Sequence, residues 1–180
     1  FAILLSGGYK AIFSWNSNLL IAFPIAFLTA GIGFLLHELM HKFVAQKYGL
    51  FAEFKAFYNM LWLALLFSLF GFIIAAPGAV FIHGFGRMIS REKNGKISLA
   101  GPATNIVLAV IFLISLLLVG KEGFIGAIFS YGLTINALLA AFNMIPVMPF
   151  DGAKIISWSK GIYFVTLIVA IELFVGSWVL

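Results

Sequence analysis

The sequence has no cysteine and very few charged side chains. Of its 180 residues, 9% are charged and 63% are hydrophobic, and the mean hydropathy is +1.15. Soluble domains carry about a quarter charged residues, so the composition excludes an ordinary soluble domain and indicates an integral membrane protein. Without cysteine there are no disulfides, thiolate metal ligands or cysteine nucleophiles, and a zinc site must use histidine and carboxylate.

The net charge of +5 does not indicate nucleic-acid binding. The basic residues lie in short loops between apolar runs, where they act as topology signals. No internal repeat is found. We therefore expect a single domain over residues 1–180, with its core at 19–160: a membrane all-α protein, folded as a polytopic transmembrane helix bundle.

The apolar runs predict where the helices lie. The first helix is expected to span from residue 19 and end near Gly49, and later runs cover 57–76, 97–120, 124–145 and 162–180. Val80, Ile82 and Phe85 predict an extended strand. Asn94-Gly95, within a polar basic segment, predicts a tight turn.

The strongest chemical signal is His37-Glu38-Leu39-Met40-His41, near the end of the first apolar run. Histidines four residues apart project from the same face of a helix, which suits two ligands of one tetrahedral zinc. The glutamate between them is placed to act as general base toward a water on the metal. The alternative is a chance pair of histidines at the wet end of a membrane helix.

A catalytic zinc usually has a third protein ligand and one open position. The acidic and histidine side chains that could supply it are Glu53, His83, Glu92, Glu122, Asp151 and Glu172. If residues 57–76 simply crossed the membrane, Asp151 would lie on the opposite side from His41. If residues 57–86 enter and return as a membrane-embedded strand or re-entrant segment, Asp151 comes back beside the histidines.

The basic residues favour the return. With it, nine of the eleven Lys and Arg residues lie on the side of the histidines, whereas a simple crossing leaves four there. The positive-inside rule then predicts that this side is cytoplasmic. We predict Asp151 as the third ligand, the alternative being a helix N-cap. Glu172 is interpreted as a polar contact between helices, Glu53 and Glu92 as solvated loop charges, and His83 is left open.

A second block supports this choice. Asn143-x-x-Pro146-x-x-Pro149-x-Asp151-Gly152, together with the histidine motif and Gly101-Pro102-Ala103-Thr104-Asn105, closely resembles the site-2 protease family of intramembrane zinc metalloproteases. The resemblance covers roughly residues 37–152. It implies His37, His41 and Asp151 as ligands of one zinc ion and Glu38 as the base, and a positioning or oxyanion-stabilising role for Asn143.

The function implied is hydrolysis of peptide bonds in transmembrane protein substrates, by a multi-pass protein of a prokaryotic cell membrane. The partners expected are the substrate and the lipid bilayer, with no nucleic acid; the oligomeric state is not predicted. Two alternatives stay open at this point: a prenyl-protein type of membrane protease, whose third ligand is a glutamate, and a transporter or metal-binding scaffold without proteolysis. A transporter should show repeats and paired broken helices, and the sequence shows neither.

Overall fold

The computed structural model describes residues 17–70, 78–83 and 88–180. Its elements follow the order α3 Ser17–Ala26, η1 Phe27–Gly31, α4 Ile32–Lys47, β1 Phe51–Ala56, α5 Tyr58–Leu69, β2 Gly78–His83, α6 Arg91–Val119, α7 Gly123–Asn143, α8 Asp151–Trp158 and α9 Lys160–Gly176. In this part of the chain four helical segments are long and apolar enough to cross a membrane: Leu20–Lys47, Arg91–Val119, Gly123–Asn143 and Lys160–Val179. The predicted fold class, a membrane helix bundle with a short strand segment, is confirmed.

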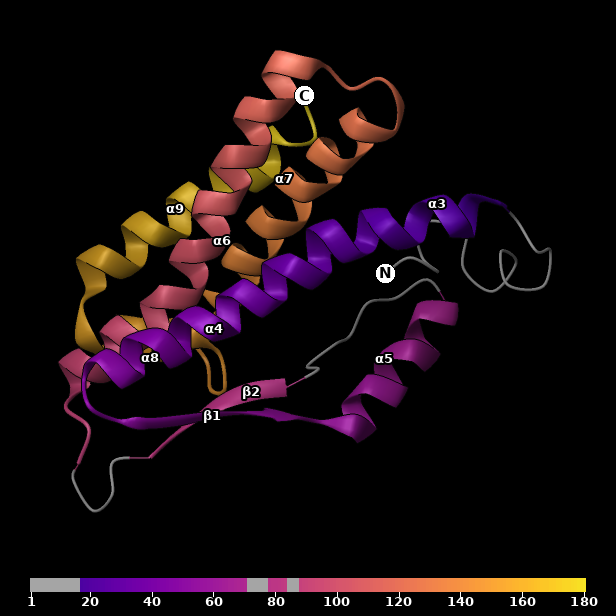
Figure 1. The fold of residues 1–180 in the computed structure, drawn as a ribbon. Coiled ribbons are helices and arrows are strands. Elements are labelled where there is room, and N and C mark those ends of the chain that lie inside the picture. The colour runs from indigo at the N-terminus through magenta and orange to yellow at the C-terminus, as the bar shows by residue number, and fades with distance from the viewer. Residues whose placement is uncertain (1–16, 71–77, 84–87) are drawn as a thin grey trace.

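The first span is continuous through α3, η1 and α4 and lies obliquely across the bundle (Figure 1). Its middle turn, η1, is a π-helix. Thr29 in that turn is fully buried, and its hydroxyl donates to the Ile25 carbonyl at 2.6 Å. The π-turn lies against α7, so the packing of the span against the bundle is fixed two turns before the histidines.

Between α4 and α6, the described residues form two paired strands and a short helix and not a membrane-crossing helix. The helix α5 has 12 residues, about 18 Å, which is too short for a hydrocarbon core of about 30 Å. Strands β1 and β2 pair antiparallel, with a register from Phe51↔His83 to Ala56↔Gly78. The predicted strand is confirmed as far as residue 83, and the rest of it, with the apolar residues 71–77, lies outside the described residues.

The turn predicted at Asn94-Gly95 is wrong, because both residues lie in the first turns of α6. Ser90 caps this helix by accepting from the Lys93 amide at 3.3 Å. Gly95 faces α8, and a Cβ at this position would overlap the Trp158 side chain. Glycine is thus needed here for close helix packing and not for a turn.

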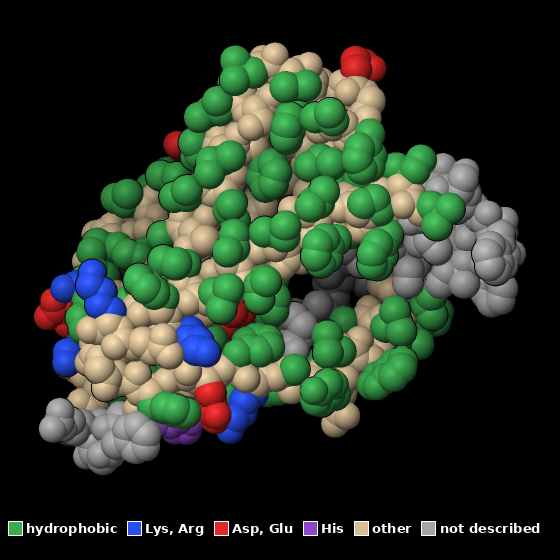
Figure 2. Space-filling model, in the orientation of Figure 1, with side chains coloured by type: hydrophobic (Ala, Val, Ile, Leu, Met, Phe, Trp, Pro, Cys, Tyr) green, Lys and Arg blue, Asp and Glu red, His purple; other side chains and the backbone are tan. Residues whose placement is uncertain are grey.

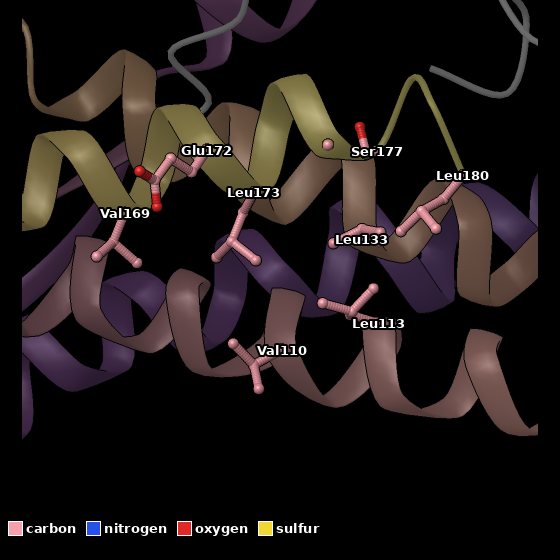
Figure 3. Close-up of a pocket in the computed structure, with 9 residues that line it drawn as sticks. Val110, Leu113, Leu133, Val169, Glu172, Leu173, Ser177 and Leu180 are labelled. Carbon is pink, nitrogen blue, oxygen red and sulfur yellow. The ribbon is translucent and has the colours of Figure 1, made fainter.

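The helices α6, α7 and α9 pack into the part of the bundle that is farthest from the sheet (Figure 1). Their core contains the buried Ala109, Leu116, Leu133 and Ala137. A cavity of about 240 Å³ lies between the three helices, with Glu172 on its α9 side (Figure 3). Glu172 makes no hydrogen bond or ion pair with the described part of the chain, so the polar interhelical contact expected for it is not seen there.

Charged and apolar side chains are segregated along the molecule. Hydrophobic side chains cover most of the visible surface, and the visible basic side chains gather toward the end that carries α8 and the sheet (Figure 2). Apart from Lys121, the described basic residues belong to the end of α4, to β1, to the start of α6 and to α8 and α9: Lys42, Lys47, Lys55, Arg91, Lys93, Lys96, Lys154 and Lys160. Lys10 and Arg87, which also entered the topology count, lie outside the described residues.

Candidate metal centre

Three buried side chains from two distant parts of the chain meet at one point. His37 and His41 come from α4 and Asp151 from α8, and each offers one ligand atom within 4.8 Å of the other two. The two Nε2 atoms are 3.0 Å apart, and Asp151 Oδ2 is 3.4 Å from that of His37 and 3.1 Å from that of His41. The structure therefore brings together the three residues that the sequence analysis selected as ligands.

Local structure explains how Asp151 reaches this point. The helix α7 ends at Asn143, and α8 begins at Asp151, with Phe150 as its N-cap residue. The N-cap alternative for Asp151 is therefore wrong, because its side chain points to the histidines. Gly152 lies so close to the Met144 backbone that a Cβ would overlap it. With Asp151 beside the histidines, the chain between α4 and α6 returns to the side from which it started, as the count of basic residues favoured.

Hydrogen bonds on the far side of each imidazole fix which ring nitrogen carries the hydrogen. His41 Nδ1 is 2.8 Å from the Ile97 carbonyl oxygen, which can only accept. His37 Nδ1 is 2.5 Å from Asn105 Oδ1. Each Nδ1 is therefore the donor, and in the neutral rings each Nε2 keeps its lone pair.

The resulting arrangement fits a zinc ion. Two lone pairs and a carboxylate oxygen face one another across about 3 Å, which is repulsive without a cation between them. Zinc bonds of 2.0–2.1 Å in a tetrahedron require ligand atoms about 3.3 Å apart. The three observed separations, 3.0, 3.1 and 3.4 Å, lie close to that value.

Space at the centre is kept open by Gly101 of α6. A Cβ on this residue would overlap the Nε2 atoms of both His37 and His41. The helix α6 thus approaches the ligands with its backbone, and the glycine of the Gly101-Pro102-x-x-Asn105 sequence leaves room where the ion would lie. The donor set, the separations and this opening all fit a zinc ion.

Electrostatics keep Asp151 ionised. Burial favours its neutral form, but the His41 and His37 imidazoles and the Lys154 ammonium outweigh burial and hold the pKa of this carboxyl well below its usual range. Lys154 Nζ lies 3.5 Å from Asp151 Oδ1, the oxygen that does not face the histidines. One oxygen is therefore held by Lys154, and the other remains available as a ligand.

Glu38 is a residue of α4, and its side chain lies next to the centre, between the helix and the sheet. It is buried, and its Oε2 accepts a hydrogen bond from the Val80 amide of β2 at 3.0 Å. In an antiparallel pair the amides alternate between the partner strand and the free edge. The Val80 amide lies on the free edge of β2, so the carboxylate of Glu38 and one edge of the sheet border the same site.

The other predicted or considered residues bond to groups other than the three ligands. Asn143, at the end of α7, donates from Nδ2 to the Leu139 carbonyl at 2.9 Å, and its catalytic role stays a prediction. His83 is half exposed on the sheet, 3.8 Å from Glu53. Glu53 lies in β1 and not in a loop, where it pairs with Lys55 at 2.7 Å.

Two fully buried asparagines were not assigned a role from the sequence. Asn105 holds His37, and Asn136 donates to the Gly132 carbonyl at 2.9 Å and accepts from Asn105 at 3.0 Å. The signal for Asn105 was its place in the Gly-Pro-x-x-Asn stretch. For Asn136 the signal was an amide in the middle of a strongly apolar helix, where polar residues mark interhelical hydrogen bonds.

The fold and the site together define a membrane protein with a buried His-His-Asp centre. Comparison with known proteins finds several relatives. A protein of Methanocaldococcus jannaschii named "Putative zinc metalloprotease MJ0611" is 43% identical over 153 residues, which cover 84% of this chain and 79% of that protein. YwhC of Bacillus subtilis, with the same zinc metalloprotease description, is 28% identical over 74% of this chain and 68% of its own length. Rip3 of Mycobacterium tuberculosis, described likewise, is 31% identical over 83% of this chain and 33% of its own.

The chain belongs to the site-2 protease-like family of zinc metalloproteases that these relatives represent. The relatives are archaeal and bacterial, in keeping with the prokaryotic origin expected from the sequence. No family model matches the chain, and no solved structure matches it either.

Proposed function

We propose that this chain is an intramembrane zinc metalloprotease that hydrolyses peptide bonds of transmembrane protein substrates. The observation that carries the proposal is the convergence of His37, His41 and Asp151, with both Nδ1 hydrogens directed away from the centre. One zinc ion per chain would be held by these three residues. When bound, zinc supplies a Lewis acid that lowers the pKa of a water and polarises a carbonyl.

Glu38 moves the protons in this proposal. Its carboxylate takes a proton from the attacking water and later passes that proton to the leaving amine. The burial of its side chain and the hydrogen bond from the Val80 amide hold Oε2 at the edge of the centre. One carboxylate can serve both transfers, because the attacking oxygen and the leaving nitrogen are bonded to the same tetrahedral carbon and lie close together.

Asn143 is proposed to stabilise the oxyanion. An amide nitrogen carries two hydrogens, and the Leu139 carbonyl takes one of them. The second hydrogen is available to the developing oxyanion, an effect of about 3 kcal/mol in other hydrolases. This role requires the end of α7 to approach the bound substrate.

The substrate is proposed to bind as an extended strand along the free edge of β2. A helical backbone has its carbonyls bonded internally, so a membrane-spanning substrate must unwind before a peptide bond can enter the centre. An unwound segment satisfies its backbone groups by pairing with a strand edge. The Val80 amide marks that edge and lies next to Glu38, which places the paired strand beside the catalytic base.

The distribution of the basic residues supports a proposed orientation in the membrane. Most described Lys and Arg residues lie at the end of the molecule that carries the metal centre, whereas Lys121 lies in the loop between α6 and α7. We propose that the centre opens toward the cytoplasm, because cytoplasmic loops carry the excess of basic residues. Water would enter along the polar end near Lys42 and Asp151.

The test compares metal content and cleavage in the same preparations. Purified protein in liposomes is given fusions that carry a transmembrane segment, and zinc is measured by mass spectrometry. Glu38→Gln should keep its zinc and lose activity by about 10²–10⁴-fold, the usual contribution of a general base. Glu92→Gln, at an exposed carboxylate paired with Lys96, is the matched control and should cleave normally.

The same experiment separates the alternative functions. A transporter or metal-binding scaffold has no need of Glu38 as a base, so unchanged behaviour of Glu38→Gln would overturn the protease proposal. A prenyl-protein type of protease needs a glutamate as third ligand. Among the described residues the only group of three metal-ligating side chains is His37, His41 and Asp151, which favours the aspartate-ligand family.

A further inference from the structure

A line of buried amides crosses the interior of the bundle where α4, α6 and α7 meet. Asn105 of α6 and Asn136 of α7 are both fully buried. Asn105 Nδ2 lies 3.0 Å from Asn136 Oδ1 and 3.2 Å from the Gly33 carbonyl oxygen of α4. These contacts join three spanning helices directly behind the metal centre, and neither asparagine is one of the three ligands.

The orientation of each amide is determined by backbone carbonyls, which can only accept. The Gly132 carbonyl requires Asn136 to present its Nδ2 at 2.9 Å, so Asn136 Oδ1 faces Asn105 as an acceptor. The Gly33 carbonyl and this Oδ1 together take both hydrogens of Asn105 Nδ2. Asn105 Oδ1 is left as an acceptor, and its partner is His37 Nδ1.

We propose that Asn136 is a positioning residue for His37, acting through Asn105. Asn136 fixes the Asn105 amide, Asn105 accepts the Nδ1 hydrogen of His37, and His37 thereby presents an unprotonated Nε2 to the metal. This inference rests on the proposed function, because it assigns the two amides a role at the zinc centre. Partners of this kind behind a metal-bound histidine typically change metal affinity by 10–100-fold.

The two histidines differ in how they are held. His41 donates to the Ile97 backbone carbonyl, which no side-chain substitution removes. His37 depends on a side chain, and that side chain depends on Asn136. Gly33 makes the arrangement possible, because a Cβ at this position would overlap Asn136 Oδ1. Loss of Asn136 should therefore disturb His37 and leave His41 unchanged, which gives the test an internal reference.

The test uses the full chain without substrate. Asn136→Ala and Asn105→Ala are compared with Thr29→Ala, a matched truncation of a fully buried polar residue that bonds only its own helix. Zinc affinity is measured by competition with a chelator. In zinc-free protein labelled with 15N-histidine, the ring nitrogen signals report which nitrogen of His37 and of His41 carries the hydrogen.

We expect Asn105→Ala to weaken zinc binding by about 10–100-fold. Asn136→Ala should weaken it by less, about three- to tenfold, because Asn105 keeps its bond to Gly33. Thr29→Ala should have no effect. In both asparagine variants the His37 ring should show a mixture of tautomers, while His41 stays protonated on Nδ1. If Asn136→Ala does not fold, Asn136→Val keeps bulk at the helix crossing and still removes the acceptor.

Unchanged His37 signals and unchanged zinc affinity in a folded Asn136 variant would overturn the inference, as would equal disturbance of His37 and His41. These readouts are independent of the proposed function. If the wild type binds zinc but cleaves no peptide, the protease proposal is overturned, and the inference about Asn136 is not affected. A cleaving enzyme with an unaffected His37 in the variant would end only the inference.

Discussion

The Val80 amide donates to Glu38 Oε2 at 3.0 Å and so connects strand β2 with the helix that carries the metal-binding histidines. Val80 is paired in register with Phe54, but its amide is directed to the helix and not to β1. The proposed base and the proposed substrate-binding edge are thus held together by a single backbone hydrogen bond.

Val80→Pro removes this donor without removing a hydrogen bond between β1 and β2. Proline has no N–H and is tolerated where the amide faces the free edge of a strand. We expect kcat/KM for a transmembrane fusion to fall by about tenfold, with zinc content unchanged, because Glu38 loses its anchor. Val80→Ala keeps the amide and is the control. Equal activity of both variants would show that the amide does not position Glu38.

Gly101→Ala should abolish metal binding. The added methyl group would occupy space at the Nε2 atoms of both histidines, where the ion would lie. We expect zinc affinity to fall by at least about 10²-fold, while the helical signal in circular dichroism is retained. Gly161→Ala in α9 is the matched control, since nothing lies within 4 Å of a Cβ there, and it should bind zinc normally. Stoichiometric zinc in Gly101→Ala would contradict the placement of the ion.

Asp151 should release no proton when zinc binds, because it is already ionised in the zinc-free protein. The pKa of Asp151 lies below the ordinary value of about 3.9, so its stabilising effect is present above that pH and is lost only as the pH falls through the lowered value. Asp151 is therefore already ionised between pH 5 and 7. The 13C signal of the Asp151 carboxyl in zinc-free protein should therefore stay constant between pH 5 and 7, and a titration midpoint in this range would contradict the prediction.

Asp151→Asn tests whether the charge of this carboxylate contributes to metal binding. The variant should bind zinc about 10–100-fold more weakly, because a ligand oxygen loses its charge. Unchanged zinc affinity in a folded Asp151→Asn variant would mean that the carboxylate is not a ligand.

Gly95→Ala should act on the metal centre from a distance. The added methyl group would overlap Trp158, the last residue of α8, and Asp151 is the first residue of the same helix. A shift of α8 away from α6 moves the Asp151 carboxylate, so we expect both a lower melting temperature, by several degrees, and weaker zinc binding. Gly176→Ala, with open space around it, should leave both unchanged. Normal zinc affinity in a destabilised Gly95→Ala would separate helix packing from ligand placement.

The sequence predicted the parts of this structure that depend on strong local patterns. The spanning helices follow from runs of apolar residues, and the two histidines follow from helical spacing. Asp151 could be selected because the number of membrane crossings and the positions of the basic residues restrict which side of the membrane each loop occupies. The Asn94-Gly95 prediction failed because tertiary packing against Trp158 overrides the local turn preference.

Other features depend on contacts that no local pattern contains. The pairing of β1 with β2 and the direction of the Val80 amide are set by the register between strands more than twenty residues apart in the sequence. The role of Asn136 depends on where α7 crosses α4 and α6. The number of residues between Asn136 and His37 gives no indication of their connection.

The π-turn at Phe27–Gly31 has a consequence for insertions and deletions in this protein. A π-turn contains one residue more than the α-helical path that it replaces. Because the extra residue is taken up within this turn, removing one residue from it would restore a regular helix and leave the parts before and after it facing nearly as they do now. In a regular α-helical stretch the same deletion would rotate everything that follows by about 100° relative to everything before. The π-turn thus gives the span one place where its length can change by a residue while His37 and His41 still face Asp151.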